Sequence, residues 1–209
     1  NLGFWQQSEQ TTADGLKLLD QIPNSEFLRV RLMAHSPWYL IWTGQYMKAK
    51  QEIEQGLRFI ERVSDVTSVP FFLNSIGLVL GLQKCYTESY DLLLDANARF
   101  DQLGGTNTFG KAMAFGFWGT ILRRQGNFAD AEIYLERSLS LKQGAKMMGG
   151  VPELRNWLGE LSEVRAKREE PPARMELLSL AEQHYRYALD LRWTGRKHYE
   201  CVALTGLTR

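Results

Sequence analysis

The sequence has few cysteines and no excess of charge of either sign. Cys85 and Cys201 are the two cysteines among 209 residues, and their spacing fits neither a metal site nor a redox motif. We interpret both as small buried thiols. The 25 basic residues are balanced by 24 acidic ones, which gives no reason to expect nucleic acid or an anionic membrane as a partner. This composition favours a folded protein of the reducing cytoplasm.

Long hydrophobic runs are also missing. The most apolar stretch, residues 71–82, is shorter than the ~20 residues that a transmembrane helix needs, and the N-terminus has no signal-peptide pattern. The chain starts at Asn1 without an initiator methionine, and both of its ends fall inside helical patterns. We therefore expect a fragment of a longer protein.

Residues that carry catalysis or bind metal ions are scattered along the chain. His35, His184 and His198 are unclustered, and no Ser/His/Asp, Cys/His or HExxH arrangement occurs. Paired carboxylates fall on faces of helices that we expect to be solvated. The sequence therefore predicts no enzymatic activity, no metal site and no bound cofactor.

One stretch imitates a nucleotide-binding motif. Residues 105–111, GTNTFGK, fit the G-x-x-x-x-G-K spacing of a phosphate-binding loop. However, Ala112 stands where a hydroxyl should hold magnesium, and residues 91–103 before the motif have a helical pattern. Because a phosphate loop needs a strand-to-helix turn to aim its amides, we interpret this stretch as a linker between helices. ATP binding through Lys111 stays open as an alternative, which the lack of any ATP effect on the melting temperature would exclude.

Helical periodicity is strongest in residues 115–141. Small residues, Gly119 and Ala131, occupy the positions where two helices would approach most closely. Gly126 is placed to end the first helix in a left-handed conformation, and Asn127 to cap the second. The stretch therefore predicts two antiparallel helices. The residues at helical spacing are Phe115, Trp118, Gly119 and Leu122 in the first, and Phe128, Ala131, Leu135, Ser138 and Leu139 in the second.

The two-helix pattern recurs along the chain. The small residues that mark it, Ala49, Ser89 and Ala131, are 40 and 42 positions apart, so the repeats have long helices or long connections. Pro37 interrupts one first helix, and we expect a kink or break near Ser36. The expected repeats are residues 1–23, 25–63, 70–103, 110–142 and 151–191, with the start of a further one at 196–209.

This pattern resembles the tetratricopeptide repeat, in which an aromatic and a Leu-Gly pair on one helix face an aromatic and small residues on the next. The resemblance predicts an all-α fold, a right-handed superhelix (α-solenoid) of about five antiparallel helix pairs forming one domain over residues 1–209. Each pair would bury its apolar face on its neighbours.

Two segments resemble a narrower group. Residues 91–121 and 189–207 are similar to repeats of large bacterial signalling ATPases, including transcriptional regulators of the maltose-regulon-activator type. In such proteins the repeat region senses an inducer or partner. The resemblance implies that this chain is the sensor part of a cytosolic regulator, and the sequence contains neither the ATPase nor the DNA-binding part.

In tetratricopeptide repeats, five positions of each first helix line a concave groove. Trp38 and Trp42 would stack along its wall as binding hot spots, unless the Pro37 kink turns both into the core. Arg123 and Arg124 could offer bidentate contacts to a carboxylate. Asn and Lys are missing from the positions that hold C-terminal carboxylates in this family. The positions carried over are Arg31, Ala34, Trp38, Ile41 and Trp42; Phe71, Asn74, Leu78, Gly81 and Leu82; and Met113, Gly116, Thr120, Arg123 and Arg124.

The first functional hypothesis is a non-catalytic module that binds a protein segment, a peptide or a small effector in this groove. The alternative is a structural scaffold whose repeats link domains or self-associate without a groove ligand. Neither hypothesis involves nucleic acid or a membrane.

Overall fold

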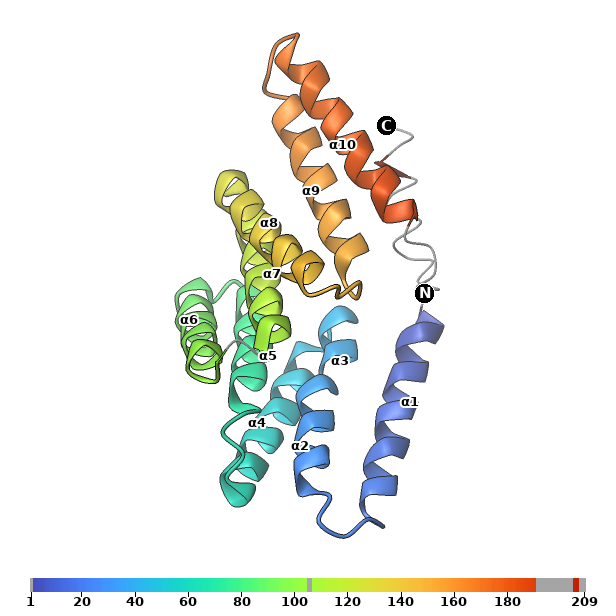
Figure 1. The fold of residues 1–209 in the computed structure, drawn as a ribbon, viewed down its shortest axis with the longest axis vertical. Coiled ribbons are helices and arrows are strands. Elements are labelled where there is room, and N and C mark those ends of the chain that lie inside the picture. The colour runs from blue at the N-terminus through green and yellow to red at the C-terminus, as the bar shows by residue number, and fades with distance from the viewer. Residues whose placement is uncertain (1, 105–106, 191–204, 207–209) are drawn as a thin grey trace. The chain divides into compact units, whose positions relative to one another are not determined.

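The computed structural model describes the whole chain apart from residues 1, 105–106, 191–204 and 207–209. Every regular element in the described part is a helix, and that part contains no strand, which confirms the all-α prediction (Figure 1). The chain divides into two compact units, residues 1–110 and 111–209. Each is described by itself, and the grouping of all 209 residues in one superhelical domain stays a prediction.

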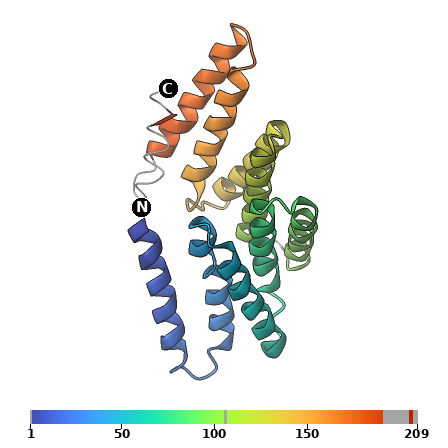
Figure 2. The same ribbon diagram turned by 180° about the vertical axis from the view of Figure 1, so that it is seen from behind.

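The first unit contains successive helices that pack on their neighbours in the chain. Contacts join α1 to α2 and α3, α4 to α2, α3 and α5, and α5 to α6. Helices α1 and α2 run antiparallel and lie side by side in both views (Figure 1 and Figure 2). The helices are α1 Leu2–Leu19, α2 Glu26–His35, α3 Trp38–Trp42, α4 Tyr46–Val63, α5 Val69–Leu82 and α6 Tyr86–Gln102.

The second unit begins inside α7, whose first turn belongs to the first unit. Contacts join α8 to α9 and α9 to α10, and the last two helices run antiparallel (Figure 1). The helices are α7 Thr108–Gln125, α8 Phe128–Gly144, α9 Val151–Ala166 and α10 Ala173–Asp190.

The expected helix pair in residues 1–23 is wrong. This segment forms the single helix α1, because no glycine or proline interrupts residues 4–14. Side chains support the continuous helix across the expected turn: Thr11 donates to the Gln7 carbonyl (2.7 Å), and Gln10 donates to Asp14 (2.9 Å). Helix α1 is instead a partner of α2.

The expected break at Pro37 is confirmed. Helix α2 ends at His35 and α3 begins at Trp38, because proline has no N–H to continue the backbone ladder. The hydroxyl of Ser36 donates to the Met33 carbonyl (3.2 Å) and to Glu52 Oε2 on α4 (3.0 Å). The break is therefore held in place by a bond to the next helix.

The four expected pairs after residue 25 correspond to helices of the structure. The first consists of α2 and α3 paired with α4, and the others are α5 and α6, α7 and α8, and α9 and α10. A glycine recurs at the closest approach in three of these pairs, where an added Cβ would lie 2.9, 2.6 and 2.8 Å from the nearest side-chain atom of the facing helix. Such distances leave no room for a methyl group. The contacts are Gly77 with Leu93, Gly119 with Leu135 and Gly159 with Tyr185.

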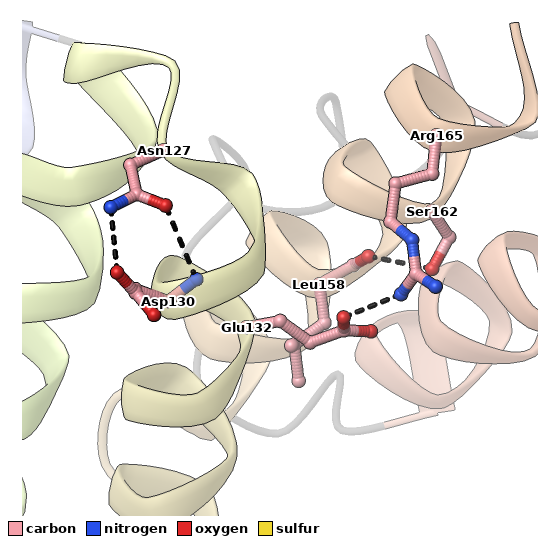
Figure 3. Close-up of polar contacts among 6 residues, drawn as sticks. All are labelled: Asn127, Asp130, Glu132, Leu158, Ser162 and Arg165. Carbon is pink, nitrogen blue, oxygen red and sulfur yellow. Dashed lines mark hydrogen bonds and ion pairs between the residues drawn. The ribbon is translucent and has the colours of Figure 1, made fainter. Parts of the chain in front are cut away.

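The turn between α7 and α8 has the predicted chemistry. Gly126 adopts a positive φ of +82°, which glycine accepts without a steric penalty. The side chain of Asn127 accepts a hydrogen bond from the Asp130 N–H (3.5 Å), and its amide donates to Asp130 Oδ2 (2.7 Å; Figure 3). Both caps are confirmed.

Helices α8 and α9 are joined by two polar ties. The buried ammonium of Lys142 donates to the Gly149 carbonyl (2.7 Å) in the connection between them. Arg165 near the end of α9 pairs with Glu132 on α8 (Figure 3). The Lys142 bond thus fixes the connection, and the ion pair of Arg165 with Glu132 fixes the two helices to each other.

Expectations for the two cysteines and for the C-terminal segment also meet the structure. Cys85 precedes α6 and is exposed, contrary to expectation, because it lies in a connection rather than on a packed face. Cys201 lies outside the described residues. The expected start of another repeat at 196–209 is described at residues 205–206, where Gly206 packs on Tyr185. No helix of the described residues combines the length and the apolar character needed to cross a membrane.

Candidate functional site

Eight of the fifteen predicted groove positions are buried. Helices α5 and α7 are apolar around most of their circumference, so several faces pack against neighbours instead of one. The side chain of Thr120, for example, is turned back onto its own helix and donates to the Gly116 carbonyl (2.8 Å). These positions face the interior rather than an open groove. The eight are Ala34, Ile41, Asn74, Leu78, Gly81, Met113, Gly116 and Thr120.

The remaining positions divide between the units. Arg31, Trp38, Phe71 and Leu82 lie in the first unit and are exposed or half-buried. Arg123 is half-buried and Arg124 exposed, both at the end of α7 in the second unit. The side chain of Trp42 lies outside what the structure describes, so its predicted orientation stays open.

In the first unit, four rings meet at what we call the aromatic cluster: His35, Trp38, Phe71 and Phe109. The His35 ring is central, with its centroid 5.7 Å from that of Trp38, 5.9 Å from that of Phe71 and 6.4 Å from that of Phe109. These contacts are edge-to-face, the arrangement that aromatic quadrupoles favour. None of the four residues is fully buried. The cluster is therefore a packed aromatic surface rather than part of the core.

Four elements hold the aromatic cluster: the end of α2, the start of α3, and the first turns of α5 and α7. The Phe71 ring also packs on the buried ring of Phe100 (5.0 Å). The indole N–H of Trp38 donates to the hydroxyl of buried Ser75 on α5 (3.3 Å). The amide of buried Asn74 donates to the Gly110 carbonyl (3.1 Å), which ties the start of α7 to α5. The cluster is thus fixed before any partner arrives.

His35 is neutral at pH 7. The residue is exposed, but its imidazole is partly desolvated by the rings around it, and this desolvation is the first cause that lowers its pKa. The positive charge of Arg31, one turn earlier on α2, lowers the pKa further. A neutral imidazole has one donor and one acceptor nitrogen, so His35 adds polarity to the cluster without adding charge.

Arg31 links the cluster to a second exposed ring. Its guanidinium lies over the ring of Phe27, 5.6 Å from the centroid. Phe27, Arg31 and His35 are spaced i, i+4 and i+8, so they follow one face of α2 toward Trp38. Phe27 is 48% exposed, an unusual position for a phenylalanine. We call Phe27 and Arg31 the α2 stripe.

Three of these residues were missed by the sequence reasoning. Phe27 and His35 do not occupy the positions carried over from the repeat family, and Phe109 was assigned to a linker. The helical spacing of Phe27, Arg31 and His35 was a usable signal. The position of Phe109 was not, because only the fold brings the start of α7 beside α2 and α5.

In the second unit, Arg123 already has partners. It forms an ion pair with Glu160 of α9 (2.6 Å), and its guanidinium lies 6.0 Å from the ring centroid of Trp157. An external carboxylate would have to displace Glu160. Arg124, the next residue along α7, is exposed. Because Arg123 is already paired with Glu160, the geometry does not favour a carboxylate site formed by both arginines.

Contrary to our expectation, the motif at residues 105–111 is not a linker throughout, because residues 108–111 form the start of α7. Helix α6 ends at Gln102, α7 begins at Thr108, and Lys111 lies within α7. A phosphate loop has a strand before it, and here a helix precedes the motif. Within the described residues, no group of three or more His, Cys, Asp or Glu side chains could hold a metal ion.

Residues 71–144 match the family model described as tetratricopeptide repeat. The matched region runs from the start of α5 to the end of α8, two of the expected repeats, and is similar to that family in both sequence and helix pairing. A comparison with curated proteins found no match for the chain. The narrower resemblance to signalling ATPases stays a prediction.

Proposed function

We propose that this chain is a non-catalytic protein-binding module whose contact surface is the aromatic cluster with the α2 stripe. Tetratricopeptide repeats generally mediate protein–protein interaction, and the region that matches them contributes Phe71 and Phe109 to this surface. The observation that carries the proposal is a set of packed rings that remains partly exposed to solvent.

Energetics support this assignment. Aromatic and arginine side chains are the groups most enriched among binding hot spots, and the surface contains both. The bonds from Trp38 to Ser75 and from Asn74 to Gly110 hold the rings in place. A preorganised surface loses less conformational entropy when a partner binds, so more of the contact energy appears as affinity.

A scaffold that self-associates is the alternative, and one observation favours it. Helix α10 exposes four large hydrophobic side chains, with 36–64% of their surface accessible. Met175 and Leu178 are three residues apart and therefore share one face of α10, and an exposed apolar pair of this kind is typical of a contact with another protein surface. The four are Met175, Leu178, Leu180 and Tyr187.

The setting of this module in a cytosolic, multidomain regulator is part of the proposal. Its support is the similarity of residues 91–121 and 189–207 to repeats of bacterial signalling ATPases. A small effector, rather than a protein, would be the ligand if the sensor role of those regulators applies here.

The test is affinity capture from a lysate of the source organism with the wild-type chain and a His35→Ala/Phe71→Ala variant. Leu94→Ala on α6 is the matched control, because Leu94 is 53% exposed and lies outside the surface. Captured proteins are then purified and their binding is measured directly. We expect a partner that binds wild type and control equally and the double variant at least tenfold more weakly. Equal binding to all three chains would assign the contact to another surface.

A sedimentation experiment separates the alternative. If the chain self-associates through α10, Met175→Ser/Leu178→Ser should shift it toward monomer, and the His35→Ala/Phe71→Ala variant should not. If the aromatic cluster with the α2 stripe binds a separate partner instead, neither pair of substitutions should change the oligomeric state of the chain.

A further inference from the structure

We infer that the aromatic cluster and Arg31 recognise an acidic–aromatic segment of a partner protein. Such a segment would carry a carboxylate near an aromatic side chain. This inference rests on the proposed function and specifies the chemistry of its ligand.

The charge of the surface sets the first requirement. Arg31 is exposed, and within the described residues no carboxylate lies within ion-pair distance of it. The neighbouring arginine of the same helix, Arg29, is by contrast neutralised by Asp20. The guanidinium of Arg31 lies over the face of the Phe27 ring, and we infer that its N–H donors can bind a carboxylate.

Two acidic side chains beside the α2–α3 corner are hydrogen-bonded to other residues of the chain. Glu52 of α4 accepts from the Ser36 hydroxyl (3.0 Å), and Glu9 of α1 accepts from the Tyr39 hydroxyl (3.1 Å). Both carboxylates thus attach to the sides of the α2–α3 corner that face α1 and α4. Burial also raises the pKa of Glu52. The charge that acts on His35, the central ring of the cluster, is the positive charge of Arg31.

The neutral rings set the second requirement. A further aromatic ring can pack against His35, Trp38 and Phe71. Such aromatic pairs stabilise binding beyond the contribution of the apolar area that the ring buries. Because His35 is uncharged at pH 7, an aromatic side chain meets no buried cation there. A basic partner side chain would meet Arg31 and be repelled.

The geometry sets the spacing. Arg31 and Trp38 are seven residues apart, and Ser36 and Pro37 between α2 and α3 keep right-handed helical dihedral angles, so the helical rise of about 1.5 Å per residue gives roughly 10 Å. An extended peptide covers this distance in about three residues. The segment therefore has an acidic residue and an aromatic one about three positions apart.

The experiment measures binding of the full 209-residue chain to fluorescein-labelled nine-residue peptides by fluorescence anisotropy. The reference peptide has one Asp and one Phe three positions apart in a Gly/Ser background. Three others replace the Asp by Asn, the Asp by Lys, or the Phe by Ser. We expect the reference peptide to bind tightest and the Asn peptide about tenfold more weakly, the loss of one hydrogen-bonded charge pair.

Arg31→Gln tests the assigned contact. In this variant the Asp and Asn peptides should bind equally, while Arg58→Gln, an exposed arginine of α4, should keep the wild-type preference. Circular dichroism melts check that both variants fold. A preference for Asp that survives in Arg31→Gln overturns the inference.

Two further outcomes overturn the inference and keep it distinct from the proposed function. If the wild-type chain binds all peptides with Phe equally, and His35→Ala/Phe71→Ala weakens them all, the surface binds partners without selecting acid. If none of the peptides binds, the acidic–aromatic assignment is wrong, and the captured partner of the previous experiment decides the proposed function.

Discussion

At the scale of single residues, the close packing of side chains explains where glycines occur. The closest helix approaches occur at glycines because the facing side chains already fill the space, as Leu135 does at Gly119. Protein interiors have crystal-like density, so even one methyl group is felt.

We expect Gly119→Ala to lower the free energy of unfolding by about 1–3 kcal/mol, because the new Cβ would lie 2.6 Å from Leu135 Cγ and force both helices apart. Gly144→Ala is the control, since nothing lies within 4 Å of a Cβ at the end of α8. Urea unfolding measures both. A Gly119→Ala chain as stable as Gly144→Ala would contradict the close packing of α7 on α8.

His184 makes stability depend on pH. It is buried between α9 and α10, where burial first and the charge of Arg155 second lower its pKa to about 4. Arg155 donates to its Nδ1 (3.1 Å), so the proton of the neutral ring is on Nε2. In the unfolded chain the pKa returns to about 6.5, so the unfolded state binds more protons between these two values.

We therefore expect full stability from His184 above about pH 6.5 and a progressive loss as the pH falls toward 4. His184→Gln keeps an acceptor for Arg155 but cannot titrate. The difference in unfolding free energy between the two chains should change with pH only inside this window. A constant difference would mean that His184 is not kept neutral by the fold.

At the scale of elements, the helix ends are set by local chemistry where a side chain supplies it. Asn127 accepts from the Asp130 backbone and so satisfies one donor that the start of α8 would otherwise leave open. Cys85 occupies the same position at α6 and makes no such bond.

We expect Asn127→Ala to cost about 1 kcal/mol of stability and Cys85→Ala to have little effect, because only the first removes a capping bond. Thermal unfolding followed by circular dichroism compares them. Equal effects would show that the Asn127 bond contributes nothing to α8.

At the scale of the molecule, helix α7 runs through the boundary between the two units. Repeat arrays gain stability from each repeat and from its contact with the next, so a helix shared by both units couples them. Gly77 and Gly159 provide one close approach in each unit.

We expect Gly77→Ala and Gly159→Ala each to shift one common unfolding transition, by about 2–4 °C for every kcal/mol lost. The midpoint measured by circular dichroism and by tryptophan fluorescence should move together. Two separate transitions, with only one displaced in each variant, would show that the units unfold independently.

Much of the fold was predictable because helices and their ends depend on residues that are close together in the sequence. Gly126, Asn127 and Pro37 acted as expected, since a cap, a left-handed turn and a proline break each depend on a few adjacent positions. The expected pair in residues 1–23 failed where the pattern was weak and no breaker residue supported a turn.

The candidate site was only partly predictable. Positions carried over from the repeat family identified Arg31, Trp38 and Phe71 as surface groups. They also identified Asn74 and Leu78, which are buried because α5 is apolar on nearly every face. A family position says where a residue lies on its helix, and the packing of the other helices decides whether it is exposed.

The sequence alone determined the helical class, the pairing of most helices and the glycine at the contact between α7 and α8, because these follow from spacing along a single chain. Only the tertiary structure decided the surface. His35, Trp38, Phe71 and Phe109 come from four different helices, and no local pattern specifies that their rings meet. The partial desolvation of the His35 imidazole by the surrounding rings, which lowers its pKa, is likewise a property of the packed chain, since a pKa depends on the groups that surround it in space.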